Sequence, residues 1–93
     1  MNMQPGSSQG FAALKTPIFT DTVSIQLINC LQGLMEAILL DENGTVCRKV
    51  ETEVSENAQE FNWEGLNDLP YGIYTLQLLH GLNEMSVRII KRV

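Results

Sequence analysis

A chain of 93 residues is enough for one domain and too short for two. The 44% hydrophobic and 18% charged residues are typical of a folded globular domain rather than a disordered tail. The formal net charge of -5 removes the electrostatic attraction on which general nucleic-acid binding and attraction to an anionic membrane depend, so neither function is expected.

The first part of the chain, residues 1–16, contains several glycines, serines and a proline and shows little periodicity. We interpret it as a flexible linker, native or left by cloning, in which Phe11, Ala12 and Leu14 dock weakly on the domain at most. It lacks the basic and apolar regions of a signal peptide, so an exported protein would be longer than this chain. No apolar run approaches the roughly 20 residues that cross a bilayer, so no membrane insertion is expected. The folded domain is expected to span residues 17–93.

The first predicted strands show apolar residues at every second position. From Thr22 onward, Val23, Ile25 and Leu27 alternate with polar residues, which is typical of a strand with one buried face. Residues 29–33 are predicted to form a loop. The next strand carries its buried face at alternate positions: Met35, Ala37 and Leu39.

A tight turn is predicted at Asp41–Gly44, because Asn43 and Gly44 both tolerate the positive φ that a short hairpin needs. The returning strand begins at Thr45 and becomes charged, which indicates a solvent-facing or edge strand. The oxygen donors of this turn also suggest a calcium site, but the EF-hand pattern is absent and the turn explains them better.

The second half of the chain repeats the alternation. Phe61 and Trp63 predict a strand, with Trp63 at the centre of the core, and Leu69–Gly72 predicts a turn. The following strand places alternate residues inward: Tyr74, Leu76 and Leu78. A loop is expected at His80–Glu84, followed by a last strand from Met85 to about Lys91 with three inward residues: Met85, Val87 and Ile89.

Six strands and no convincing helix are expected, separated by turn signals. Short strands at this spacing predict an all-β fold, an immunoglobulin-like β-sandwich of about six to seven antiparallel strands.

The residue types that support catalysis are sparse. His80 is the only histidine and is predicted to be an exposed loop residue, so no Cys–His or Ser–His pair is expected and the chain is predicted not to be an enzyme. Two cysteines and one histidine fall short of a four-ligand zinc site, and no cofactor or metal is expected. Whether Cys30 and Cys47 form a disulfide or remain separate thiols is left open.

Four segments carry short motifs in a fixed order. Pro17–Ile25 leads from a proline into the first strand, and Ala37–Val46 joins two strands through an Asp-x-x-Gly turn. Leu66–Leu76 contains Leu-x-x-Gly-x-Tyr-x-Leu, and Val87–Val93 is a final strand with basic residues. In this order, and over residues 17–93, the segments resemble the C-terminal sorting domain of the bacterial type IX secretion system, the Por system of the Bacteroidetes type.

The sequence departs from that family at three places. The opening keeps one proline of the family's Pro-Asn-Pro, Leu40 stands where the family often has Tyr, and Thr45 stands where it often has Arg. These departures weaken the first two motifs and leave the last two intact.

The resemblance implies a sandwich attached behind a cargo protein. The cargo would cross the inner membrane by an ordinary signal and the outer membrane under the direction of this domain. The implied partners are the type IX secretion machinery, a sortase that cleaves the domain, and the fused upstream cargo, which is then anchored to a surface lipopolysaccharide. The implied location is secreted or at the cell surface, by way of the periplasm and the outer membrane.

Five motif residues are candidates for recognition: Gly44, Gly72, Tyr74, Lys91 and Arg92. Turn geometry alone also explains the glycines, a core position explains Tyr74, and an ordinary charged strand end explains the basic pair. The final strand is expected to be uncovered and to offer backbone groups and charge to the machinery, with sortase cleavage upstream of Pro17. Two other functions stay open, a structural module like the flagellar hook-capping scaffold and an adhesive or carbohydrate-binding domain.

Overall fold

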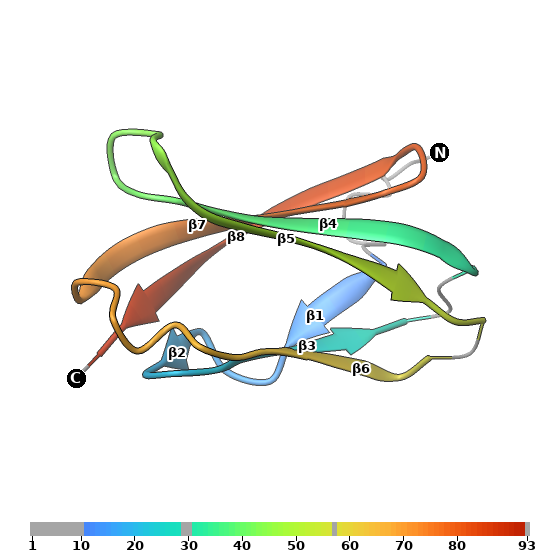
Figure 1. The fold of residues 1–93 in the computed structure, drawn as a ribbon, viewed down its shortest axis with the longest axis horizontal. Coiled ribbons are helices and arrows are strands. Elements are labelled where there is room, and N and C mark those ends of the chain that lie inside the picture. Colours follow the sequence, from blue (N-terminus) through green and yellow to red (C-terminus); the bar gives the residue numbers. More distant parts are fainter. Residues whose placement is uncertain (1–10, 29–30, 57, 93) are drawn as a thin grey trace, which may run out of the picture.

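The computed structural model describes residues 11–28, 31–56 and 58–92, and these form an all-β sandwich of eight strands in two sheets (Figure 1). The strands are β1 (Ala12–Leu14), β2 (Ile18–Phe19), β3 (Val23–Leu27), β4 (Gly33–Leu40), β5 (Val46–Val54), β6 (Glu60–Trp63), β7 (Gly72–His80) and β8 (Asn83–Lys91). None of the described residues forms a helix of the length and apolar character needed to cross a membrane.

The order of the strands is that of an immunoglobulin-like sandwich, which confirms the predicted fold class. One sheet has the order β1-β3-β6 and the other has the order β2-β8-β7-β4-β5. Strands β3 and β6 correspond to strands B and E of that architecture, while β4, β7 and β8 correspond to C, F and G. Strand β5 adds an edge next to β4, as the extra strands of variable-type domains do.

Two strands in the first part of the chain were not expected. Strand β1 lies inside the segment interpreted as a linker and pairs antiparallel with β3, with Ala12 opposite Leu27. Phe11 and Ala12 are buried rather than weakly docked, because β1 covers one edge of the smaller sheet. Strand β2 pairs parallel with β8, so the described part of the fold has eight strands and is not wholly antiparallel.

The core lies between the two sheets and is made of the residues that alternate inward. Trp63 is 6% exposed, which confirms its predicted place in the core. Met85 and Val87 are inward as expected but only half-buried, since they lie near the edge of the larger sheet. The largest side chains that are almost fully enclosed come from both sheets and the β6–β7 loop: Ile25, Met35, Leu39, Leu66, Leu76, Leu78 and Ile89.

The turn predicted at Asp41–Gly44 is present and is defined by side-chain hydrogen bonds, and Leu69–Gly72 leads into β7 as expected. The loop predicted at His80–Glu84 is shorter, because β7 extends to His80 and β8 begins at Asn83. Between β4 and β5, the carboxylate of Asp41 accepts hydrogen bonds from the backbone N–H groups of Asn43 and Thr45, each at 2.9 Å. Gly44 has a φ of 82° and Gly72 has a φ of 152°, in the region that L side chains rarely adopt. The prediction that turn geometry accounts for both glycines is therefore confirmed.

Candidate recognition surface

The four motif segments meet at one end of the sandwich, which we call the motif end (residues 17–19, 41–45, 70–74 and 90–92). Backbone hydrogen bonds join the first segment to the last, from Ile90 N to Pro17 O at 2.7 Å and from Arg92 N to Phe19 O at 2.8 Å. Strand pairing joins the third segment to the last, with Ile73 opposite Ile90. The β4–β5 turn, the β6–β7 loop and the end of β8 lie on the same side of the molecule (Figure 1).

A shallow hollow of about 290 Å³ connects the second and third segments. It is lined by the β4–β5 turn together with the residues that open β7: Asp41, Glu42, Asn43, Cys47, Pro70, Tyr71, Gly72, Ile73 and Tyr74. The Asp-x-x-Gly turn and the Gly-x-Tyr element are therefore neighbours, although about 30 residues separate them in the chain.

Tyr74 organises the interior of the motif end. Its hydroxyl donates a hydrogen bond to the carbonyl of Pro70 at 2.6 Å, and its ring packs edge-on against Phe19 at a centroid distance of 6.4 Å. A tyrosine that bonds back to the backbone a few residues upstream is a recurring device of immunoglobulin-like sandwiches. Burial, with smaller effects from Cys47 and Asp41, raises the pKa of Tyr74. Tyr74 is 5% exposed, so it shapes the surface from beneath.

Lys91 lies inside the fold, contrary to the expectation that it offers charge at an exposed strand end. It is 4% exposed, because alternation along β8 places it on the same face as Ile89. Its ammonium group donates a hydrogen bond to the carbonyl of Arg92 at 2.9 Å. Arg92, in contrast, is exposed as expected.

The end of β8 is covered, contrary to the expectation of an open final strand. Strand β2 lies beside it, with Ile18 opposite Ile90 and Phe19 opposite Lys91. The carbonyls of Pro17 and Phe19 accept hydrogen bonds from the backbone N–H groups of Ile90 and Arg92. The features that the end of β8 presents to a partner are therefore its side chains rather than its backbone.

An ion pair fastens the β6–β7 loop to β5 close to the motif end. Arg48 contacts the carboxylate of Asp68 at 2.8 Å and donates a second hydrogen bond to the carbonyl of Gly65 at 3.1 Å. The hydrogen bond from Arg48 is the main reason that the pKa of Asp68 lies below its usual range, and Lys91 adds a smaller effect. The loop that leads into Leu69–Gly72 is thus held by charge as well as by the core residue Leu66.

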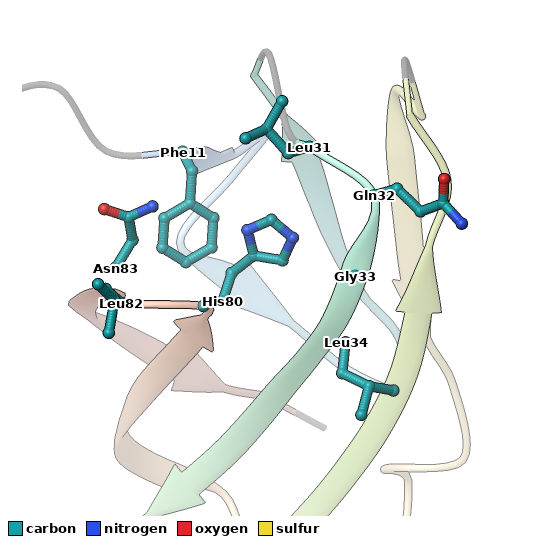
Figure 2. A pocket seen from close by; sticks show the side chains of 9 residues that line it. Phe11, Leu31, Gln32, Gly33, Leu34, His80, Leu82 and Asn83 are labelled. Atoms are coloured by element: carbon teal, nitrogen blue, oxygen red, sulfur yellow. The ribbon is translucent and has the colours of Figure 1, made fainter.

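A second hollow, of about 550 Å³, lies at the opposite end, which we call the His80 end (Phe11, 31–34 and 80–83). Figure 2 shows the ring of His80 between Phe11 and Gly33, with Leu31, Leu34 and Leu82 around it. The rings of Phe11 and His80 lie 5.6 Å apart.

His80 is 7% exposed, so the prediction of an exposed loop residue is wrong. It is the last inward residue of β7, and the alternation that begins at Tyr74 would have identified it as buried. The imidazole Nε2 is enclosed without a hydrogen-bond partner among the described residues. The sequence analysis missed this residue because His80 and Gly81 together were interpreted as the start of a loop.

The described part of the chain holds no group of three or more His, Cys, Asp or Glu side chains placed to bind a metal ion. Cys47 lines the hollow at the motif end and His80 lines the hollow at the other end, so these two residues do not form a nucleophile–base pair. Cys30 lies outside the described residues, and with it the question of the disulfide. Comparison with models of known protein families and with curated proteins finds no match to the chain.

Proposed function

We propose that the chain is a C-terminal sorting domain of the type IX secretion system, which directs a fused cargo across the outer membrane. The observation that carries this proposal is the meeting of all four motif segments at the motif end. A partner that recognises a folded surface needs them together.

The geometry at the motif end supports recognition. Its turns are held by Asp41, Tyr74 and Arg48 through hydrogen bonds, so the surface is preorganised and binding costs little ordering. Of the five candidate residues, Gly44 and Gly72 set the turns and Tyr74 and Lys91 lie beneath the surface. Arg92 is the candidate whose side chain is exposed to a partner.

Cleavage by the sortase is proposed to fall upstream of β1. Ala12–Leu14 are hydrogen-bonded to β3, and a protease that needs extended, accessible backbone would be hindered there. This moves the proposed cleavage region from upstream of Pro17 to upstream of Phe11.

The test is a fusion of residues 1–93 behind a signal peptide and a reporter protein, produced in a bacterium that has the type IX machinery. The reporter is expected at the cell surface or in the medium, and it is expected to stay in the periplasm of a matched strain that lacks the machinery. A reporter that stays in the periplasm of both strains would contradict the proposal.

A carbohydrate-binding or adhesive module is the second candidate function, and one residue favours it. Tyr71 is 72% exposed, and an exposed aromatic ring is a common platform for a sugar face. Binding of the purified domain to polysaccharides that is lost in Tyr71→Ala would favour this function. Absence of binding to a panel of polysaccharides would leave sorting as the better account.

A further inference from the structure

The cations of this chain divide into two groups. Three of the six Lys and Arg residues form ion pairs, Lys15 with Glu60, Arg48 with Asp68 and Lys49 with Glu36. The other three have no ion pair among the described residues, and all lie at the end of β8: Arg88, Lys91 and Arg92. Within the described residues, the side-chain cations without an ion pair therefore all lie on or directly after β8, in a chain whose net charge is -5.

A row of isoleucines crosses three strands at the same place. Ile18 of β2 lies opposite Ile90 of β8, which lies opposite Ile73 of β7. Their side chains face outward from the larger sheet and are 40%, 36% and 40% exposed. The solvent face of an antiparallel sheet is usually polar, so a row of three isoleucines on it calls for an explanation.

The unpaired arginines and the isoleucines belong to one surface. Arg88 and Arg92 lie two positions before and two positions after Ile90, so strand alternation places them on the same face. Tyr71, two positions before Ile73, is 72% exposed and lines a hollow together with Ile73 and Ile90. A hollow of about 490 Å³ lies in this region, lined by Tyr71, Gly72, Ile73, Ile90, Lys91 and Arg92.

We propose that this surface, named the isoleucine row (Ile18, Ile73, Ile90, Tyr71 and the flanking arginines), docks a protein partner. The partner presents an apolar patch with carboxylates at its rim, because the isoleucines need an apolar counterpart and the arginines lack an acidic one. The inference rests on the proposed function, since the partner is then a component of the secretion machinery. The surface is small, which fits a transient contact from which the cargo is later released.

Two other occupants fit the charges less well. A second copy of the chain would bring together two domains of net charge -5. An anionic membrane would face the same repulsion, and the carboxylates of Asp41 and Glu42 line a hollow together with Tyr71, beside the row. A protein partner can confine its carboxylates to the rim of an apolar patch. It then pairs with Arg88 and Arg92 without presenting an extended anionic surface to the rest of the domain.

The test uses two variants of the reporter fusion described above. Ile73→Thr with Ile90→Thr keeps the strand preference of both positions while removing apolar surface, and Arg88→Glu with Arg92→Glu reverses the charge. Two control variants make the same kinds of change elsewhere. Leu34→Thr alters an exposed leucine at the other end of the same sheet, and Lys15→Glu reverses a cation directly after β1. Circular dichroism and thermal unfolding of each purified domain verify that it folds.

Each row variant is expected to lower surface delivery by about tenfold or more, a change that corresponds to about 1.4 kcal/mol of lost affinity, while both controls stay near the wild type. Suppressor mutations that restore delivery of the charge-reversed domain are expected to change Asp or Glu to Lys or Arg in a secretion component. If the wild-type fusion is delivered and both folded row variants are delivered equally well, the docking surface is wrong and the sorting function stands. If the wild-type fusion is not delivered, the sorting function fails and the partner proposed here fails with it.

Direct binding measurements distinguish the other occupants. Binding of the wild-type domain to phosphatidylglycerol vesicles that is lost on charge reversal would identify a membrane as the occupant. A dimer in analytical ultracentrifugation that dissociates in Ile73→Thr with Ile90→Thr would identify a second copy. Either result would overturn the proposal of a protein partner with an acidic rim. A domain that is monomeric and does not bind the vesicles supports the proposal.

Discussion

The two ends of the sandwich differ in how their polar groups are treated. At the motif end the Tyr74 hydroxyl and the Asp41 carboxylate have partners within the fold, and so does the Arg48 guanidinium beside it. At the His80 end, Nε2 of a buried imidazole has no partner among the described residues, and the surrounding Leu31 and Leu82 are largely exposed. Satisfied polar groups hold a surface in one shape, whereas an unsatisfied one weakens the fold locally.

This difference teaches where to look for function in a small sandwich. A hollow of about 550 Å³ lies at the His80 end, yet the motif segments gather at the other end, together with the cations that have no ion pair among the described residues. A partner that recognises a folded domain needs a surface of fixed shape, and the hydrogen-bonded turns of the motif end provide one. Substitutions in the common core and substitutions at one end should therefore differ in their effects.

The largest loss of stability is expected for Trp63→Ala, because the indole is buried in the core that lies between the two ends of the sandwich. Truncation of a buried tryptophan costs about 3–5 kcal/mol, which a domain of this size hardly survives. Urea unfolding followed by circular dichroism measures the change. A folded variant with nearly wild-type stability would show that the two ends do not depend on this core.

A smaller loss is expected when the glycines of the motif end receive a branched side chain. Gly44→Val and Gly72→Val meet no atom within 4 Å of the new Cβ, so the cost comes from the positive φ, at about 1–3 kcal/mol each. Thr45→Val, at an exposed neighbouring position, serves as the control. Equal stability of all three variants in urea would contradict the turn geometry.

Tyr74→Phe is expected to cost about 1 kcal/mol at neutral pH through the lost hydrogen bond to Pro70. It is also expected to change the response to alkali. The pKa of Tyr74 is raised above its ordinary value of 10.0, so its contribution to stability is complete below pH 10 and is lost as the pH rises through the raised value. The wild type should therefore lose more stability above pH 10 than Tyr74→Phe, and identical pH profiles would refute the burial effect.

The smallest effect is expected for His80→Leu, which removes the unpartnered nitrogen while keeping an apolar side chain of similar size. The gain from deleting an unsatisfied buried atom and the loss of the contact with Phe11 oppose each other, so the net change should lie within about 1 kcal/mol of the wild type. Thermal and urea unfolding measure it. A loss of several kcal/mol in the free energy of unfolding would mean that His80 stabilises its end of the sandwich as the hydrogen-bonded groups stabilise the motif end.

Much of the fold could be predicted from the sequence because its long strands alternate clearly. The apolar positions of β3, β4 and β7 and the Asn43–Gly44 pair carry strong local signals. Strands β1 and β2 have three and two residues, too few to show a period, and their place depends on the strands beside them. Alternation from Ile89 would have placed Lys91 inside, but its charge argued for the surface.

The motif segments could be identified from the sequence, but the way they assemble into one surface could not. Each motif was identified locally, yet the parallel pairing of β2 with β8 is a long-range contact that no local pattern encodes. The isoleucine row shows the same limit, because Ile18, Ile73 and Ile90 become neighbours only through the order of the strands in the sheet. The local signals define the elements, and the tertiary pairing defines the surface.

The most direct test of the motif end as the recognised end is photocrosslinking in living cells. A photoreactive phenylalanine analogue replaces Tyr71 at the motif end or Leu82 at the His80 end, both of which are exposed. Each variant is carried by the secreted reporter fusion in a bacterium with the type IX machinery. We expect a discrete adduct with a secretion component from position 71 and none from position 82. An adduct from position 82 alone, or equal adducts from both positions, would contradict the account.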